Sequence, residues 1–439
     1  MSGDPGDTGI ETAARPTRAL VLHPDLRGRT AARPAEAALE EATALAHALP
    51  GIDLRGGQVV RLPRAHPGTL FGSGKLEELK ALIAEQEIGL VLVDGPVSPV
   101  QQRNLEKAWG VKLLDRTGLI LEIFADRART RDGVLQVELA ALSYQRTRLV
   151  RAWTHLERQR GGLGFVGGPG ETQIEADRRA IDTQMVRLKR QLEKVARTRE
   201  LHRAARRRVP YPVVALVGYT NAGKSTLFNR LTGADVMAKD MLFATLDPTM
   251  RAVRLEGGLE VILSDTVGFI SDLPPQLVAA FRATLEEVLE ADLIVHVRDI
   301  AHPETEAQAA DVAAILADLG VGEDVPVLEF WNKIDLLPPD DPALAVASRR
   351  EGVFAVSALS GAGLAPALAA VAGLLDAARR RETLVLGHAE GRARAWLFEA
   401  GVVEDEAPGE DGSVLTVTWS AAQRRRFEAL RGEGTEGSG

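Results

Sequence analysis

The stretch GYTNAGKS has residues whose types and spacing suit the binding of phosphates. Gly218, four further residues, and then Gly223, Lys224 and Ser225 match the P-loop pattern. The apolar run before it, residues 213–217, predicts a buried strand, and the pattern after it predicts an amphipathic helix. Glycines here let backbone N–H groups surround phosphate oxygens, and the start of the helix faces their negative charge. We expect Lys224 to reach the β- and γ-phosphates of a nucleoside triphosphate, and Ser225 to bind Mg²⁺.

A second group of candidate residues follows the apolar run EVILS. Asp265 ends this predicted strand, where its carboxylate can hold the hydration shell of the Mg²⁺. Gly268 can offer its N–H to the γ-phosphate. A further magnesium ligand is expected between the P-loop and Asp265. The stretch DMLFATLDPT offers Thr245 and Thr249, and spacing alone does not decide between them.

Base selection is predicted from a third stretch, VLEFWNKIDLL. It reads as a strand followed by residues 332–335, NKID. The carboxylate of Asp335 can accept both N–H donors on the guanine edge, whereas adenine presents neither in that geometry. Ser357 and Ala358, at the end of the strand pattern VFAV, are expected to back the base. These elements, in this order, are specific for a GTPase, an enzyme that converts GTP to GDP and phosphate.

The water-orienting glutamine that many GTPases carry after this Asp-x-x-Gly signature is missing here. Phe269 and Ile270 follow Gly268, and neither side chain can hydrogen-bond to water. We therefore expect slow hydrolysis by the isolated protein until another element completes the site. One candidate is K⁺ beside Asn221, which would make hydrolysis faster in potassium than in sodium salts; the alternative is that Asn221 only caps the loop. The other candidate is a partner that orders residues 240–249.

The rest of the sequence predicts an α/β protein of several domains. Apolar runs alternate with helical patterns before residue 118 and again around the P-loop, which predicts parallel sheets with crossover helices. In the first region the expected strands are ALVLH, GQVVRL, IGLVLVD and VKLLD, and the expected helices are PAEAALEEATALAHAL and GKLEELKALIAEQ. Near the C-terminus, GSVLTVTW predicts a strand and AAQRRRFEALR a basic helix. The expected organisation is a disordered tail (1–17), an N-terminal α/β domain (18–118), a basic helical hairpin (119–209), a P-loop GTPase domain (210–378), a small C-terminal α/β domain (382–431) and a second disordered tail (432–439).

The hairpin is predicted from two rows of apolar residues spaced by seven. The first row is Leu135, Leu142, Leu149 and Leu156, and the second is Ile174, Ile181, Leu188 and Val195. The stretch GGLGFVGGPG lies between the rows and holds six glycines in residues 161–170. We interpret it as the tip of a long antiparallel pair of helices. Two helices of an ordinary bundle are the alternative.

Charge distinguishes this hairpin from the rest of the chain. The net charge is −8, yet 17 Lys and Arg residues stand against 7 Asp and Glu residues between Arg146 and Arg208. A basic element on an acidic body is typical of proteins that bind a polyanion. The glycines would let the tip enter a crowded RNA cavity and leave Phe165 to stack on a base. A connector without contacts is the alternative.

Composition excludes several other classes. The 439 residues include no cysteine, which excludes disulfides and thiolate metal sites. No run approaches the ~18–20 apolar residues of a membrane span, and the first residues lack the apolar core of a signal peptide. We therefore expect a cytoplasmic monomer with no stable membrane insertion.

The motifs together resemble those of the HflX family of ribosome-associated GTPases, relatives of the Obg GTPases. The GTPase region carries GYTNAGKSTLFN, LFATLDPT, DTVGFI and NKID, and the region before it carries QQRNLE, DRTGLILEIFADRARTRDGVLQVELAAL and GPGETQIEADRR. The resemblance covers roughly residues 19–375 and gives the magnesium role to Thr245. It implies binding to the large ribosomal subunit and its rRNA near the peptidyl-transferase centre, and a role in splitting or rescuing ribosomes. Two positions depart from the family pattern: Gly167 stands where an arginine is usual, and Leu359 where a lysine is frequent.

The motifs and the resemblance define one candidate site for GTP or GDP. Lys224, Thr245 and Gly268 are the candidate catalytic residues, and Ser225 and Thr245 are the candidate ligands of Mg²⁺. The candidate nucleotide-binding residues are Gly218, Tyr219, Thr220, Asn221, Ala222, Gly223, Lys224, Ser225, Thr226, Phe243, Ala244, Thr245, Leu246, Asp247, Asp265, Thr266, Val267, Gly268, Asn332, Lys333, Ile334, Asp335, Ser357, Ala358 and Leu359.

Two other functions are compatible with the GTPase motifs. A GTP-dependent membrane-associated or signalling switch is the first, although the sequence offers it no lipidation site or apolar anchor. An RNA-assembly scaffold in which GTP is structural is the second. Turnover stimulated by ribosomes would exclude this scaffold.

Overall fold

The structure is a computed structural model, which describes residues 16–27, 33–159, 169–206, 211–234, 242–243, 245–246, 248–255, 258–271, 288–322, 325–377, 380–388, 390–409, 412–419, 423–424, 427–428 and 430–431. Most of the two predicted tails, the hairpin tip with Phe165 and Gly167, and the site residues Ala244 and Asp247 lie outside these ranges. Contacts divide the chain into two compact units, residues 1–126 with 147–165 and residues 127–146 with 166–439.

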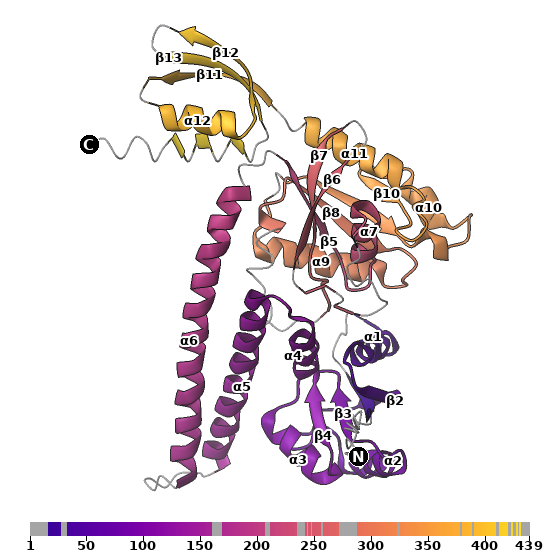
Figure 1. The fold of residues 1–439 in the computed structure, drawn as a ribbon. Helices are drawn as coiled ribbons and strands as arrows, with labels where there is room; N and C mark the ends of the chain where they lie inside the picture. The colour runs from indigo at the N-terminus through magenta and orange to yellow at the C-terminus, as the bar shows by residue number, and fades with distance from the viewer. Residues whose placement is uncertain are drawn as a thin grey trace, which may run out of the picture. The chain divides into compact units, whose positions relative to one another are not determined.

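The first unit is built on a four-stranded parallel sheet with the strand order β2-β1-β3-β4 (Figure 1). Its elements in chain order are β1 (Thr17–Leu26), α1 (Ala35–Ala48), β2 (Ile52–Leu62), α2 (Ser73–Glu85), β3 (Leu90–Val93), α3 (Pro99–Trp109), β4 (Lys112–Asp115) and α4 (Arg116–Arg127). The four expected strands and two expected helices are confirmed. The core of the unit includes Leu22, Phe71 and Val93, all almost fully buried.

Helices α3 and α4 are not anticipated by the sequence reasoning. The segment of α3 is mostly polar, and its buried residues Gln101, Leu105 and Trp109 are spaced by four along one face. Its start is nevertheless encoded locally, because Ser98 and Gln101 form a capping box and Pro99 occupies the first turn. Capping chemistry and the four-residue spacing of the buried face are together the signals for this helix.

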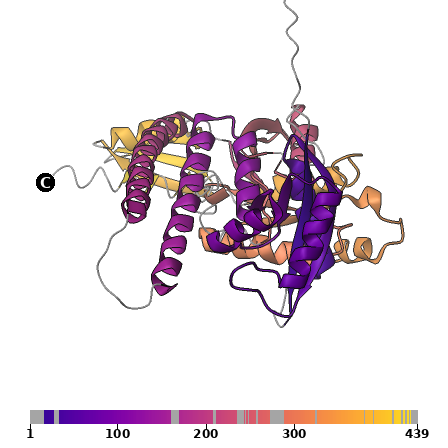
Figure 2. The same cartoon turned by 90° about the horizontal axis from the view of Figure 1, so that it is seen from below.

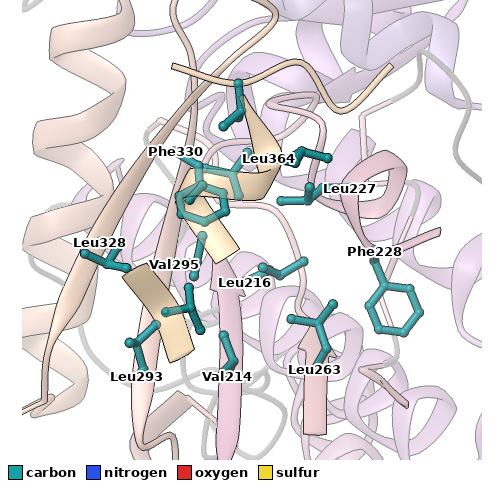
Figure 3. Packing of buried hydrophobic residues seen from close by; sticks show 14 of the residues in the cluster. Val214, Leu216, Leu227, Phe228, Leu263, Leu293, Val295, Leu328, Phe330 and Leu364 are labelled. Atoms are coloured by element: carbon teal, nitrogen blue, oxygen red, sulfur yellow. The ribbon is translucent and has the colours of Figure 1, made fainter. Parts of the chain in front are cut away.

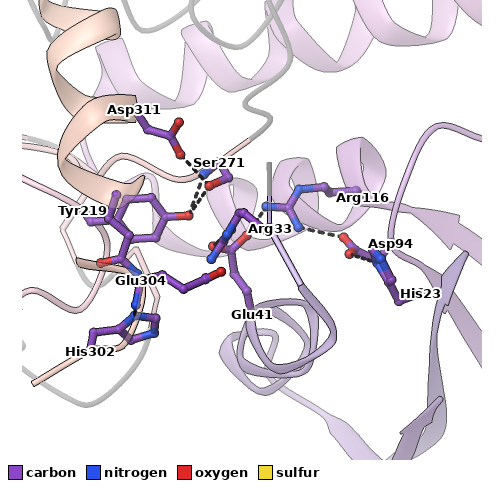
Figure 4. Close-up of polar contacts among 11 residues, drawn as sticks. His23, Arg33, Glu41, Asp94, Arg116, Tyr219, Ser271, His302, Glu304 and Asp311 are labelled. Atoms are coloured by element: carbon purple, nitrogen blue, oxygen red, sulfur yellow. Dashed lines mark hydrogen bonds and ion pairs between the residues drawn. The ribbon is translucent and has the colours of Figure 1, made fainter. Parts of the chain in front are cut away.

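A buried polar network joins the ends of β1 and β3 to α1 and α4 in this unit (Figure 4). His23 Nδ1 lies 2.7 Å from Asp94 Oδ2, and Arg116 donates to both Asp94 Oδ1, at 2.7 Å, and Glu41. Burial opposes the ionisation of Asp94, but its contacts with His23 and Arg116 prevail, so the pKa of Asp94 is lowered. These charges are therefore paired and satisfy one another inside the unit.

Two long helices follow, α5 (Arg131–Gln159) and α6 (Pro169–Arg206). The first half of α5 runs beside α6 in both views (Figures 1 and 2), and Arg146 Nε lies 2.6 Å from Asp182 Oδ1 across the pair. Leu135 and Leu188, one from each heptad row, are buried. The helices are thus present as expected, while the bounds of a hairpin domain stay a prediction.

The GTPase region forms a six-stranded sheet with the order β10-β9-β8-β5-β7-β6. Its pairs are parallel except β6–β7. Its elements are β5 (Val213–Val217), α7 (Lys224–Thr232), β6 (Thr249–Arg254), β7 (Glu260–Asp265), β8 (Leu293–Asp299), α9 (Thr305–Leu319), β9 (Val327–Asn332), a short 3₁₀ turn (Ile334–Leu336), α10 (Pro342–Ala347), β10 (Val353–Ala355) and α11 (Leu364–Ala377).

The central strands β5 and β8 are almost fully buried because both faces of the sheet are covered, and β5 is apolar along its length. Figure 3 shows Val214 and Leu216 of β5 packed with Val295, Phe330 and Leu364 from neighbouring elements. Parallel strands bring their carboxyl ends to one edge of the sheet, where ligands of open α/β sheets bind. The P-loop and the two Asp-containing signatures all follow such strand ends.

The last part of the chain is a three-stranded antiparallel sheet with the order β11-β13-β12. Its elements are β11 (Arg380–Gly387), α12 (Gly391–Glu399), β12 (Val403–Gly409) and β13 (Gly412–Trp419). The expected strand GSVLTVTW is confirmed as β13. Strands β11 and β12 and helix α12 are not anticipated. For β12 the reason lies in its sequence, VEDEAPG, which offers almost no apolar alternation.

Candidate nucleotide-binding site

The P-loop crosses from β5 to α7 through two positions where only glycine fits. At Gly218, with φ 151°, an added Cβ would lie 2.1 Å from the carbonyl oxygen of Val297. At Gly223, with φ 97°, it would lie 2.1 Å from the side-chain nitrogen of Asn332. Both contacts are far shorter than van der Waals distance. The two glycines of the P-loop pattern therefore let the loop fit against the ends of β8 and β9.

Lys224 begins α7 and folds its side chain back into the loop. Its ammonium donates hydrogen bonds to the carbonyl oxygens of Gly218, at 3.0 Å, and Tyr219, at 2.9 Å. Burial lowers the pKa of Lys224 to about 8, although the nearby Asp265 acts in the opposite direction. A buried ammonium of this kind is stabilised by an anion, and the loop around it is shaped for phosphates.

Three oxygen-bearing side chains meet beside Lys224. Ser225 Oγ and Thr245 Oγ1 donate to Asp265 Oδ2 at 2.8 and 2.9 Å, and the two hydroxyls lie 2.9 Å apart. Thr249 instead begins β6, where it pairs with Asp265 in the antiparallel register. The structure thus brings Thr245, not Thr249, to the hydroxyl of Ser225.

The chemistry of this cluster fits Mg²⁺. Hard oxygen ligands are what Mg²⁺ prefers, and it keeps waters that a nearby carboxylate can hold. Asp265 Oδ1 is buried and has no hydrogen-bond partner among the described residues, which is costly for a carboxylate oxygen. Burial raises the pKa of Asp265, while Lys224, Ser225 and Thr245 oppose the shift. A cation with its water shell would relieve both penalties.

The segment after Asp265 is held tightly against the P-loop. Thr266 Oγ1 donates to the carbonyl of Leu216 at 2.7 Å. The N–H of Thr220 donates to the carbonyl of Phe269 at 2.7 Å, and the N–H of Phe269 donates to the carbonyl of Gly218 at 3.1 Å. The Phe269 side chain is 1% exposed and belongs to the interior. It therefore neither orients water nor lines the nucleotide site.

Gly268 sits where this segment comes closest to the P-loop. An added Cβ at Gly268 would lie 2.8 Å from Thr220 Cγ2 and 3.1 Å from Lys224 Nζ. Its backbone consequently reaches the same space as the ammonium of Lys224. This juxtaposition suits an N–H that is to meet the γ-phosphate.

The predicted base-reading residues are linked to the P-loop through Asn332. Its side-chain nitrogen donates to the carbonyl of Ala222, and its oxygen accepts from the N–H of Ala358, both at 2.8 Å. Asp335 is exposed and accepts a hydrogen bond from Ser357 Oγ. A single amide thus holds the phosphate loop and the loop that backs the base in register, and leaves the Asp335 carboxylate facing solvent.

Several predicted site residues contribute backbone and not side chain. Phe243 and Leu246 are each 2% exposed, and Thr266 and Val267 are also buried, so their side chains anchor their segments. Leu359 is 71% exposed. Asn221, at φ 60°, is exposed, and its side chain makes no hydrogen bond to another described residue, so the loop-cap interpretation gains no support. K⁺ beside Asn221 stays a prediction.

Sequence reasoning missed three residues that support the site. Arg230 of α7 donates from Nε to the carbonyl of Ala358 at 2.6 Å and so fixes the loop behind the base. Ser271 and Asp311 form a hydrogen-bonded chain with Tyr219 (Figure 4). None of the three belongs to a motif, and their contacts join segments 40 to 128 residues apart. The sequence therefore carries no local signal for them.

The described part of the chain lacks two kinds of feature. No helix within it is long and apolar enough to cross a bilayer. No group of three or more His, Cys, Asp or Glu side chains in it forms a metal site of its own.

Comparison with known proteins covers most of the chain. Residues 36–125 match the family described as GTP-binding GTPase N-terminal, residues 127–206 match GTP-binding GTPase Middle Region, and residues 213–333 match 50S ribosome-binding GTPase. The chain is 48% identical to the GTPase HflX of Magnetococcus marinus over 97% of this chain and 98% of the relative. It is 45% identical to the GTPase HflX of Escherichia coli over 80% of this chain and 82% of the relative.

Among solved structures, a GTP-binding protein from the archaeon Sulfolobus solfataricus in complex with GDP is similar to 82% of this chain and 98% of its own. The TM-score is 0.45 and the identity 24%.

The position of Thr245 leads to a prediction for which Thr249 provides the control variant. Thr245→Ala removes a hydroxyl from the Ser225–Asp265 cluster and should raise the Mg²⁺ concentration needed for tight binding of a GTP analogue by roughly tenfold or more. Thr249→Ala, at the start of β6, should leave that concentration unchanged. A magnesium titration of analogue binding measures both. Equal magnesium dependence in the two variants would contradict the assignment.

Proposed function

Because this chain belongs to the HflX family of GTPases, we propose that it uses GTP hydrolysis on the large ribosomal subunit, in ribosome splitting, rescue or biogenesis. The binding surface in this proposal is the N-terminal domain together with the hairpin of α5 and α6, and the RNA it contacts is rRNA. The protein acts as a monomer in the cytoplasm, where ribosomes are found. In this proposal, GTP binding and hydrolysis by its GTPase domain control when the protein binds the ribosomal subunit and when it leaves.

The catalytic part of the proposal gives each residue of the site one task. Lys224 binds the β- and γ-phosphates, and the Gly268 N–H meets the γ-phosphate. Ser225 and Thr245 would hold Mg²⁺, and Asp265 would bind waters of the ion; a bound ion would supply positive charge beside the phosphates. Their convergence within hydrogen-bond distance supports these roles.

Hydrolysis by the isolated protein is slow in this proposal because neither Phe269 nor Ile270, the two residues after Gly268, can hydrogen-bond to water. Phe269, at the position where many GTPases carry a glutamine, is buried and engaged through its backbone with the P-loop. The missing group must come from elsewhere. A ribosomal partner that orders the segment carrying Thr245 is the source that we propose.

The observation that carries ribosome binding is the basic face of α6. A groove of about 610 Å³ runs along this helix. It is lined by Asp182, Thr183, Val186, Arg187, Arg190, Gln191 and Lys194. Asp182 is engaged with Arg146, whereas Arg187 and Arg190 form no ion pair with another described residue. Such guanidinium groups are suited to RNA phosphates, because their planar donors match phosphate oxygens.

Base selection is tested by replacing the Asp335 carboxylate, which only accepts hydrogen bonds, with an amide that can also donate one. Asp335→Asn should lose affinity for GTP and gain affinity for xanthosine triphosphate, because an amide offers the donor that the xanthine edge needs. Loss of a charge-assisted bidentate contact costs about 2–4 kcal/mol, or roughly 30- to 1000-fold in affinity. Competition binding with both nucleotides measures the switch. Unchanged GTP affinity would rule out Asp335 as the base reader.

Ribosome binding is tested by GTP hydrolysis with and without purified large subunits. We expect turnover to rise at least roughly tenfold when subunits are added, since they supply the missing catalytic element. Liposomes added in place of subunits should give no rise. Stimulation by liposomes alone would favour a membrane-associated switch, and no stimulation by subunits would contradict the proposal.

A matched pair of variants locates the contact on α6. Arg187→Glu should weaken subunit binding and reduce the slope of log affinity against log salt by about 1. Arg179→Glu, whose arginine is already paired with Glu175 one turn away, is the control and should have a smaller effect. Equal effects of the two changes would indicate a response to net charge alone.

A further inference from the structure

The hydroxyl of Tyr219 connects the P-loop to the segment that follows Gly268. Tyr219 is 5% exposed, and its hydroxyl lies 2.7 Å from Ser271 Oγ. The same hydroxyl accepts a hydrogen bond of 2.7 Å from the backbone N–H of Ser271. Ser271 Oγ in turn donates to Asp311 Oδ2 at 2.7 Å (Figure 4).

The direction of each hydrogen bond in this chain follows from the proton count. Ser271 Oγ has one proton, which goes to the carboxylate of Asp311. The proton between Tyr219 and Ser271 therefore comes from the phenol. The hydroxyls of Tyr219 and Ser271 are consequently both paired, and loss of either one leaves its neighbour without this hydrogen bond.

Tyr219 and Ser271 flank the backbone contacts that position Gly268. The P-loop and residues 268–271 run side by side, with Tyr219 bridged to Phe269 in a parallel pair. Thr220 and Gly218 make the two backbone hydrogen bonds of that pair, and Gly268 packs against Thr220. The chain of side chains extends this pairing by two residues and ends on α9, an element outside the phosphate site.

We propose that Tyr219, Ser271 and Asp311 are positioning residues that hold the N–H of Gly268 where a γ-phosphate can reach it. They thereby set the preference for GTP over GDP and connect that preference to α9. This inference rests on the γ-phosphate role of Gly268 in the proposed function. GDP lacks the phosphate concerned, so its binding does not depend on the chain.

The test compares the affinities of GDP and a non-hydrolysable GTP analogue for Ser271→Ala, with Mg²⁺ present. We expect the preference for the analogue over GDP to fall by roughly 3- to 10-fold, as loss of one buried hydrogen bond implies, with GDP affinity within about twofold of the parent. Ser271→Thr keeps the hydroxyl and should restore the preference. Asp311→Ala, in α9, should reproduce the defect of Ser271→Ala.

A double variant separates positioning from general loosening of the fold. Tyr219→Phe combined with Ser271→Ala should lose no more analogue preference than either change alone, because both break the same chain. A variant set in which GDP and analogue affinities fall equally, or in which the preference never changes, would overturn the inference. A parent protein that binds neither nucleotide would instead contradict the proposed function.

Discussion

The backbone of Gly218 lies against the carbonyl of Val297 on β8, and that of Gly223 lies against the amide of Asn332 at the end of β9. In both places a methyl group would come within 2.1 Å of its neighbour. The P-loop is therefore in close contact with β8 and with the end of β9, and a side chain at either glycine would displace a neighbouring atom. Lys224 and Ser225 directly follow Gly223, so these contacts also fix their positions.

The same contacts explain how motifs that are far apart in the sequence are brought together at the site. Asn332 contacts the P-loop through Ala222 and the base-backing loop through Ala358, so the amide that closes on Gly223 also places the base side of the site. On the other side, the backbone of Gly218 pairs with Phe269 and brings Gly268 next to Lys224. The positions proposed for phosphate, magnesium and base are thus joined by direct contacts.

The electrostatics of this unit favour a ligand. Burial lowers the pKa of Lys224 and raises that of Asp265, so both groups resist their charged forms without phosphate and a cation nearby. Burial also lowers the pKa of His296, on the adjacent strand, to about 4, so this histidine is neutral near pH 7. His296 therefore adds no second buried positive charge near Lys224. Burial of Lys224 and Asp265 costs free energy in the empty site, and the charges of a bound nucleotide and its cation would offset that cost.

The sequence predicts the parts of this protein that depend on local pattern. Apolar strands, glycines at fixed spacing and acids at strand ends are all visible along the chain, and they lead to the P-loop, to Asp265 and to Asp335. Contacts between distant segments are not visible. Arg230, Ser271 and Asp311 lie in unremarkable stretches, and Phe243 and Thr266 turn inward because of packing that only the folded sheet creates. Strand β12 is held by pairing with β13, since its own residues have little strand pattern.

Close contact with Asn332, beyond the strain of a positive φ, makes Gly223 essential to the site. The most direct measurement is GDP affinity for Gly223→Ala beside Gly233→Ala. Gly233 also has positive φ, 65°, but an added Cβ there meets nothing within 4 Å. Gly223→Ala should lose roughly 10- to 100-fold in GDP affinity from overpacking, while Gly233→Ala should lose only about 1 kcal/mol of folding stability and bind GDP like the parent. Parental GDP affinity in Gly223→Ala would contradict the account.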